Sequence, residues 1–208
     1  MAVVAVATRV VGEPMTERAD RADKILHAAA RLFAERGYGA TSIDDIGAAA
    51  GVSGPAIYWH FPGKKALLAA MLTDISERLL AGGRDAVARA TDPDSAIEAL
   101  VRMQVGFALD HPDLIIVHAR ELRHLDRDQA HRVRALQRQY VDVWVDALHM
   151  SHRRAKRERL VAAVQAAIGL INSTPYAGAL PRRSMAPLLH DMALGALGAV
   201  TSSRRGSS

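Results

Sequence analysis

The sequence predicts an all-α fold, and three observations lead to this prediction. From residue 16 onward, apolar residues recur at spacings of three and four, which is the period of an amphipathic helix. Only 4% of the 208 residues are aromatic, and alanine and leucine supply most of the apolar side chains, a composition that favours helices over a β-sandwich. No segment shows the alternating pattern of a half-buried strand.

The chain is expected to begin with a disordered tail over residues 1–15. Its apolar start has no preceding lysine or arginine and so does not resemble a secretory signal, and Met15 offers an alternative start of the protein. The first helix is predicted from Thr16 to Arg36, and Gly37 suits its C-cap. Its apolar stripe consists of Ile25, Leu26, Ala29, Leu32 and Phe33.

Two short helices are predicted next, separated by a tight turn. The first covers residues 43–50, because Ser42 offers an N-cap oxygen and two aspartates occupy the first turn, where the helix dipole favours acids. Gly51 suits the turn, since glycine adopts a positive φ without steric cost. The other short helix covers residues 53–60, with Pro55 acceptable in its first turn.

The remaining helices are longer and form the rest of the chain. The fourth is predicted to begin at Lys64 and to end at Gly82-Gly83, because glycine disfavours a helix interior. Five more follow, at about 94–110, 113–125, 127–152, 156–173 and 184–202. The boundary near residue 80 divides an N-terminal unit, residues 16–80, from a C-terminal body, residues 81–203.

Composition excludes several classes of protein. The absence of cysteine rules out disulfides, thiolate metal sites and a cysteine nucleophile. No apolar run reaches the roughly 18 residues that a membrane-spanning helix needs, so we expect a cytoplasmic protein that does not bind membranes. The sequence contains no glycine-rich phosphate loop, nucleophile elbow or His-Glu-x-x-His pattern, so we expect no enzyme activity and no cofactor.

Residues 41–61 have the spacing of a helix-turn-helix, and the residue types on its outer side suit DNA. Thr41 and Ser42 place hydroxyls at a helix N-terminus, where free N–H groups suit a phosphate. Tyr58 and His60 can donate to phosphate oxygens at the far end of the second short helix, and Lys64 adds a positive charge. This helix would enter the major groove.

Residues 20–70 resemble the TetR family of transcriptional regulators. The resemblance rests on the run from Gly37 to Ser42, on Ala50-Gly51-Val52-Ser53, and on Tyr58-Trp59-His60-Phe61-Pro62-Gly63-Lys64. It implies a homodimer that binds a palindromic operator in double-stranded DNA and that a small molecule releases. By matching position, it assigns phosphate contacts to Thr41, Ser42, Tyr58, His60 and Lys64, and groove contacts to Ser53, Gly54, Pro55, Ala56 and Trp59.

Two features of this segment affect how DNA would be read. The groove-facing helix has no arginine, asparagine or glutamine, so apolar contacts to thymine methyl groups and DNA shape should outweigh bidentate base pairing. Residues 16–66 contain seven basic and six acidic residues, which predicts modest non-specific affinity. Lys65 and Gly47 depart from the family pattern: Lys65 should add attraction to phosphate, and Gly47 should loosen its helix slightly.

The C-terminal body is expected to bind the small molecule. Met103, Phe107, Tyr140 and Trp144 are candidates for an apolar pocket, although most apolar residues here are expected to be core. Arg120, Arg123 and Arg127 share one helix face, and Arg134 and Arg138 repeat at a spacing of four on the next helix. These arginines suit either a solvated surface or an anion-binding rim over the pocket. The body resembles actinobacterial regulators of fatty-acid, branched-chain or sterol catabolism, and the resemblance suggests a long-chain or branched acyl-CoA as the effector.

Other interpretations stay open at this point. His118, Glu121 and His124 could form a metal site, but solvated or capping histidines fit the spacing better. The small residues of the last helix suit either internal packing or a subunit interface. The alternative function is a helical ligand-binding protein without specific DNA binding.

Overall fold

The computed structural model describes residues 15–177 and 180–200, with backbone only for residues 15–19, and the all-α prediction is confirmed for them. Nine α-helices and two short 3₁₀ turns, Leu122–His124 and Thr174–Tyr176, form this part of the chain, which contains no strand. The helices are α1 Met15–Arg36, α2 Ile43–Ala50, α3 Gly54–His60, α4 Lys64–Ala88, α5 Pro93–Asp110, α6 Pro112–Arg120, α7 Arg127–Ser151, α8 Arg157–Ile171 and α9 Arg182–Gly198. Of the tail expected at residues 1–15, only Met15 is described, and it begins α1.

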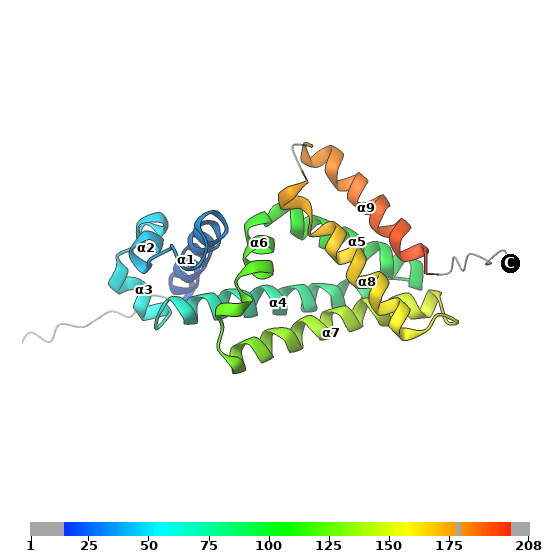
Figure 1. The fold of residues 1–208 in the computed structure, drawn as a ribbon, viewed down its shortest axis with the longest axis horizontal. Coiled ribbons are helices and arrows are strands. Elements are labelled where there is room, and N and C mark those ends of the chain that lie inside the picture. Colours follow the sequence, from blue (N-terminus) through cyan, green and yellow to red (C-terminus); the bar gives the residue numbers. More distant parts are fainter. Residues whose placement is uncertain (1–14, 178–179, 201–208) are drawn as a thin grey trace, which may run out of the picture.

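The helices form a small headpiece at one end of a larger body (Figure 1). Helices α1, α2 and α3 gather around the N-terminal end of α4, which continues into the body and lies beside α7. Helices α5, α8 and α9 pack over the other end, and α6 stands between α1 and the body. Helix α4 therefore belongs to both parts, and α6 offers a second connection between them.

Two apolar cores correspond to these two parts. The headpiece core surrounds Ile25, Phe33 and Ile57, all 1% exposed or less, and also includes Val117 of α6 and Val133 of α7. The body core is built from α5, α7, α8 and α9, which together bury their apolar stripes. Because α6 and α7 contribute to the headpiece core, a displacement of either helix would reach the headpiece through packed side chains.

The expected end of the fourth helix at Gly82-Gly83 is wrong, because α4 continues to Ala88. A Cβ atom at Gly83 would lie 2.9 Å from the Tyr140 ring, and one at Gly82 would lie 2.9 Å from the Met103 sulfur. The two glycines therefore let α5 and α7 approach α4 closely instead of terminating it. Helix α6 is also shorter than expected, since it ends at Arg120 and a 3₁₀ turn follows.

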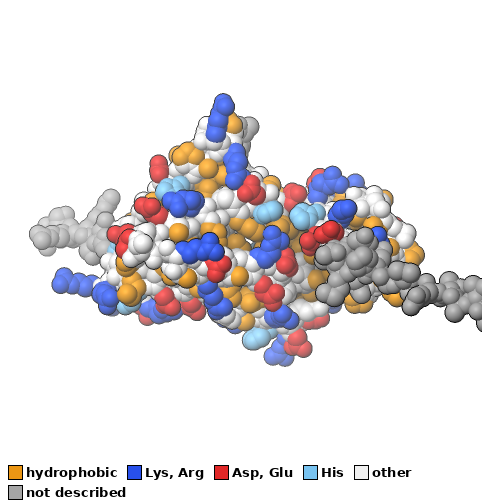
Figure 2. Space-filling model, turned by 180° about the vertical axis from the view of Figure 1, so that it is seen from behind, with side chains coloured by type: hydrophobic (Ala, Val, Ile, Leu, Met, Phe, Trp, Pro, Cys, Tyr) orange, Lys and Arg blue, Asp and Glu red, His pale blue; other side chains and the backbone are white. Residues whose placement is uncertain are grey.

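Charges of both signs are interspersed over the face of the molecule in Figure 2, and no single-sign surface covers it. Within the described residues, no helix combines the length and hydropathy that crossing a membrane requires. The interspersed charge agrees with the small excess of 27 basic over 22 acidic residues.

Candidate DNA-binding surface and ligand cavity

The helix-turn-helix forms as predicted, for identifiable local reasons. Ser42 caps α2 through a reciprocal capping box with Asp45, and Gly51 ends α2 with φ 70°. Ile46 and Ile57 are fully buried between the two helices. Gly47 has a further role that the sequence did not suggest, because a Cβ there would lie 2.8 Å from the carbonyl oxygen of Val52. This glycine lets the turn pack against α2.

The outer side of α3 is apolar and accessible. Pro55, Tyr58 and Trp59, at spacings of three and four, lie on one face of the helix. Trp59 is 81% exposed and Tyr58 is 57% exposed, which is unusual for such large side chains. The other candidate groove and phosphate residues on this segment are also accessible: Ser53 is exposed, and Gly54, Ala56 and His60 are partly exposed.

The expectation of an outward hydroxyl at Thr41 is wrong. Thr41 is 1% exposed, and its hydroxyl lies 2.9 Å from the carbonyl oxygen of Gly37, to which it donates. This bond secures the loop that leaves α1. Ser42 is exposed, but its hydroxyl donates to the Asp45 carboxylate and accepts from the Asp45 N–H. The Ser42 hydroxyl and the Ser42 backbone N–H both donate to the Asp45 carboxylate and hold the pKa of Asp45 below its usual value.

Lys64 is directed into the headpiece rather than toward solvent. Its ammonium donates to the carbonyl oxygens of Tyr38 and Thr41 at 2.8 and 2.7 Å, and it lies 4.5 Å from the centroid of the Tyr38 ring. Two of its three N–H groups are therefore already used in joining the α1–α2 loop to the start of α4. The neighbouring Lys65 is exposed and is better placed to contact a phosphate.

We predict that Lys64→Ala destabilises the protein, whereas Lys65→Ala does not. Lys64→Ala removes two charge-assisted hydrogen bonds from backbone carbonyls and should lower the free energy of unfolding by about 2 kcal/mol. Lys65→Ala should leave stability within about 0.5 kcal/mol but reduce the salt dependence of DNA binding. Urea unfolding of the two variants checks this, and equal stabilities would contradict the structural role of Lys64.

Two basic residues of α1 border the recognition segment and were not singled out from the sequence. Arg21 and Lys24 line an open groove together with Gly51, Ser53 and Ala56 at the start of α3. The sequence did contain a signal for them, because two basic residues three positions apart share one helix face, and this face is not the apolar one. They add basic groups beside the segment that would approach DNA.

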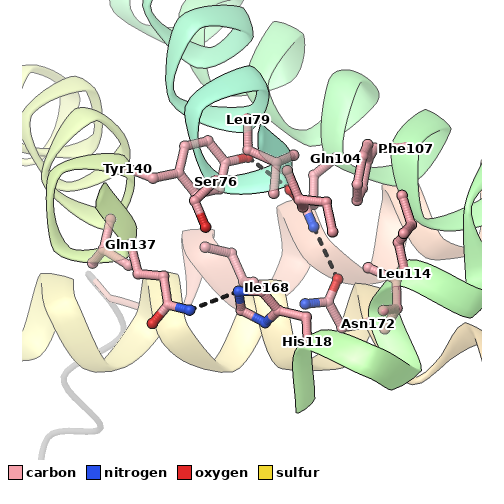
Figure 3. Close-up of a pocket in the computed structure, with 13 residues that line it drawn as sticks. Ser76, Leu79, Gln104, Phe107, Leu114, His118, Gln137, Tyr140, Ile168 and Asn172 are labelled. Carbon is pink, nitrogen blue, oxygen red and sulfur yellow. Dashed lines mark hydrogen bonds between the residues drawn. The ribbon is translucent and has the colours of Figure 1, made fainter. Parts of the chain in front are cut away.

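The body contains a cavity of about 190 Å³ between α4, α5, α6, α7 and α8 (Figure 3). Its apolar wall consists of Ile75, Leu79, Phe107, Leu114, Ile115, Val141 and Ile168. Its polar residues are Ser76, Gln104, His118, Gln137, Tyr140 and Asn172. Of these, the sequence suggested only Tyr140 as a ligand contact, and His118 only as a possible metal ligand. None of the described residues that line this cavity is an acid, a lysine or an arginine.

Only two of the six residues predicted to bind the ligand line this cavity, namely Phe107 and Tyr140. Trp144 is fully buried in the body core. Met103 packs against the body core near Gly82. Arg120 lies over the Tyr176 ring, 5.7 Å from its centroid, and the exposed Arg123 donates to His124, so neither forms a rim of the cavity.

The polar side chains of the cavity form two hydrogen-bonded groups (Figure 3). In one group the Tyr140 hydroxyl donates to the side-chain oxygen Oε1 of Gln104 at 2.7 Å, and Gln104 Nε2 donates to Asn172 Oδ1 at 2.9 Å. Burial raises the pKa of the Tyr140 phenol, so this donor keeps its proton. In the other group the Gln137 amide and His118 Nε2 lie 2.6 Å apart.

Burial lowers the pKa of His118, because the enclosed site disfavours the imidazolium form. With the Gln137 amide as donor, His118 Nε2 is the acceptor and the neutral ring carries its proton on Nδ1. The cavity wall is therefore uncharged at neutral pH. A histidine whose pKa is lower in the folded than in the unfolded state destabilises the fold as pH falls below about 6.5.

We predict that His118→Gln makes stability less dependent on pH. Between pH 7.5 and 5.5, the wild-type free energy of unfolding should fall more steeply than that of the variant, because only the wild type has this histidine to protonate on unfolding. One group contributes at most about 1.4 kcal/mol per pH unit. Denaturant unfolding across this range provides the measurement, and parallel curves would show that His118 titrates alike in both states.

The residues after α6 contact the headpiece directly. Glu121 is 4% exposed and accepts a hydrogen bond from the Tyr38 N–H at 3.4 Å. The His124 ring stacks on the Tyr38 ring at 4.7 Å, and its Nε2 lies 3.2 Å from Glu121 Oε2. His118 pairs with Gln137 instead, so the three residues considered for a metal site do not gather around one point. They connect the cavity helix α6 to the α1–α2 loop.

An open groove between α7 and α8 borders the cavity. Its lining shares Gln137 and Val141 with the cavity and adds Arg134 and Arg138, which are exposed at a spacing of four. Asp142 also lines the groove, but Arg157 already pairs with it at 2.6 Å. No carboxylate of a described residue lies within salt-bridge distance of Arg134 or Arg138. Both guanidinium groups are thus available to an anion beside the cavity.

Comparisons with known proteins agree with this architecture. Residues 25–71 match the family described as bacterial regulatory proteins, tetR family, and residues 90–194 match the tetracyclin repressor-like C-terminal domain. The HTH-type transcriptional repressor KstR2 of Rhodococcus jostii (strain RHA1) is 28% identical over 132 residues, which cover 63% of this chain and 65% of that protein. The aligned part thus spans slightly less than two thirds of this relative.

Solved structures show the same fold over most of their length. A TetR-family transcriptional regulator from Bordetella parapertussis 12822 has a TM-score of 0.74 at 27% identity, covering 83% of this chain and 93% of that one. AibR, in a complex with isovaleryl coenzyme A and operator DNA, has a TM-score of 0.70 at 21% identity, covering 83% and 97%. The family consists of regulators rather than enzymes, as the sequence predicts. The two matched domains, the helix-turn-helix headpiece and the helical body together place this chain in the TetR family of bacterial transcriptional regulators.

Proposed function

We propose that the protein is a homodimeric transcriptional repressor that binds a palindromic operator and is released by a small molecule. Residues 16–80 would bind DNA, and residues 81–203 would bind the effector and the second subunit. The exposed apolar face of α3, with Trp59 at 81% exposure, is the observation that carries this proposal. Such a face has no role in the headpiece core but suits the major groove. A repressor of this kind would act in the cytoplasm.

Two copies of α3 would enter successive major grooves about one helical turn apart. Tyr58 and Trp59 would contact thymine methyl groups and sugars, and Ser53 and Tyr58 can hydrogen-bond to the backbone. Arg21, Lys24 and Lys65 would supply electrostatic attraction to phosphate. His60 remains a candidate phosphate contact, whereas Thr41 and Lys64 would act by holding the loop before α2.

The outer faces of α8 and α9 support a dimer. Leu188 and Met192 of α9 are 46% and 48% exposed. On α8, Ala162, Ala166 and Gly169 are exposed at spacings of four and three, so another helix could approach closely. Accessible apolar side chains beside small residues are typical of helix pairs buried between subunits.

For the effector we propose an acyl-CoA with a short acyl group. The uncharged cavity would hold the acyl group, and Arg134 and Arg138 in the adjoining groove would hold the phosphates of the carrier. The fold neighbour AibR, solved with isovaleryl coenzyme A and operator DNA, adds support for this ligand class. A ligand in the cavity would displace α6, whose C-terminal end contacts Tyr38, and so favour a headpiece arrangement unable to span both half-sites.

Selection of bound duplexes from a random DNA pool, at near-physiological salt, tests the proposal. We expect enrichment of an inverted repeat, and its spacing would give the distance between the two α3 helices. The enriched duplex, titrated with isovaleryl-CoA, would then report release. If folded, dimeric protein enriches no duplex, the proposal fails and a ligand-binding protein without specific DNA binding is favoured.

A further inference from the structure

In one hydrogen-bonded group of the cavity each side chain donates to the next, and the last side chain keeps a donor without a partner. The Tyr140 hydroxyl donates to Gln104, and the Gln104 amide donates to Asn172 Oδ1. The Asn172 amide nitrogen, with two N–H groups, donates to no partner among the described residues. Figure 3 shows that this nitrogen is turned toward the space between His118, Ile168 and Gln104. An amide donor without a partner inside an apolar cavity favours a ligand that brings an acceptor.

Two other polar residues of the cavity already have hydrogen-bond partners. The Ser76 hydroxyl donates to the Leu72 carbonyl oxygen at 2.8 Å, and the Gln137 amide is bonded to His118. Because the wall has no cationic side chain and burial keeps His118 neutral, a free carboxylate would enter without a counter-charge. The complementary group is therefore an acceptor that carries no charge.

We infer that the cavity recognises a neutral carbonyl oxygen on a short apolar body, and that Asn172 Nδ2 is its hydrogen-bond donor. This inference rests on the proposed function, since it specifies the chemistry of the effector. In an acyl-CoA the acceptor would be the thioester carbonyl, and the carrier would extend toward the outer groove, which shares Gln137 and Val141 with the cavity. A small uncharged ester or ketone would present the same group without the phosphates.

The volume limits the length of this body. A protein cavity of about 150 Å³ holds one benzene molecule, so about 190 Å³ accommodates a body only slightly larger. A branched acyl group of about five carbons meets this limit, whereas a long chain does not. The cavity volume thus favours a branched acyl-CoA over a long-chain acyl-CoA, the two effectors expected from the sequence.

Two matched pairs of probes test the inference on the full-length protein by calorimetric titration. One pair is isovaleryl-CoA and its thioether analogue S-isopentyl-CoA, which lacks the carbonyl oxygen. The other pair is the isovaleryl thioester of N-acetylcysteamine and its S-isopentyl thioether analogue. Neither of these two compounds carries the phosphates of CoA. We expect the wild type to bind the thioester about five- to tenfold more tightly than the thioether within each pair that binds.

Asn172→Asp replaces the donor by an oxygen while retaining an acceptor for the Gln104 amide. We expect it to abolish the preference for the thioester, with thioether affinity as an internal reference for the integrity of the cavity. Gln139→Glu is the matched control, since it makes the same chemical change at an exposed position of α7 whose side chain accepts from Arg84. This variant should keep the preference of the wild type, and thermal unfolding of both variants verifies that they are folded.

The outcomes separate this inference from the proposed effector. Equal affinity of the wild type for thioester and thioether overturns carbonyl recognition but leaves an acyl-CoA effector standing. A preference within the N-acetylcysteamine pair, without binding of either CoA compound, supports carbonyl recognition and overturns the acyl-CoA proposal. A preference that persists in Asn172→Asp overturns the role of Asn172. If no probe binds the wild type, both proposals fail.

Discussion

Trp59→Glu should lower the affinity for the selected operator by at least about a hundredfold while leaving the fold intact. Trp59 is the most exposed large apolar side chain on α3, so its replacement removes little packing from the headpiece core. The glutamate would instead place a negative charge against the phosphate-lined groove, and like charges facing each other at an interface cost several kcal/mol. A hundredfold loss corresponds to about 2.7 kcal/mol, which is within that range.

Trp59→Phe is the matched control, because it retains an apolar ring at the same position without the added charge. We expect this variant to stay within about tenfold of the wild type. Fluorescence anisotropy with the selected duplex measures all three affinities, and thermal unfolding confirms that the headpiece remains folded. Operator affinity unaffected by Trp59→Glu would mean that this face of α3 does not approach the DNA.

The sequence predicted the helix-turn-helix well because local interactions determine it. Ser42 caps a helix that begins one residue later, and Gly51 adopts the positive φ that its turn requires. Errors arose where a distant segment determines the structure. Gly82 and Gly83 have the local signature of a helix end, but the side chains of Met103 and Tyr140 occupy the space beside them and α4 continues.

The candidate sites follow the same rule. Exposure of Tyr58 and Trp59 follows from helical periodicity, so the accessible face of α3 was predictable. The inward directions of Thr41 and Lys64 depend on a loop that only the folded headpiece places between them. The polar residues of the cavity come from four helices and from the C-cap of a fifth, α8, and each of these helices has the pattern of an ordinary amphipathic helix. Of the arginines considered for the rim, Arg134 and Arg138 line the groove beside the cavity, whereas the side chains of Arg120 and Arg123 lie elsewhere.

The double variant Arg134→Ala/Arg138→Ala should require about ten- to hundredfold more isovaleryl-CoA to release the operator. A tenfold to hundredfold change corresponds to about 1.4–2.7 kcal/mol, which is modest for two hydrogen-bonded ion pairs because solvent screens both exposed guanidinium groups. Within the described residues neither group has an intramolecular ion pair that would compete with a phosphate. Both residues are exposed on α7, outside the helix-turn-helix, so operator affinity without effector should be unchanged. The measurement is the concentration of isovaleryl-CoA at half-maximal release of the labelled duplex.

Arg120→Ala/Arg123→Ala removes the same charge from the same body and therefore controls for a general electrostatic effect. Arg120 lies over Tyr176 and Arg123 contacts His124, both away from the groove between α7 and α8. Screening acts alike on exposed charges, so a response that depended only on net charge would weaken equally in both double variants. A larger effect in the Arg120 and Arg123 variant would mean that these two arginines bind the phosphates. It would contradict binding of the phosphates in the α7–α8 groove. A selective loss in the Arg134 and Arg138 variant would instead identify this groove as the binding site of the anionic carrier.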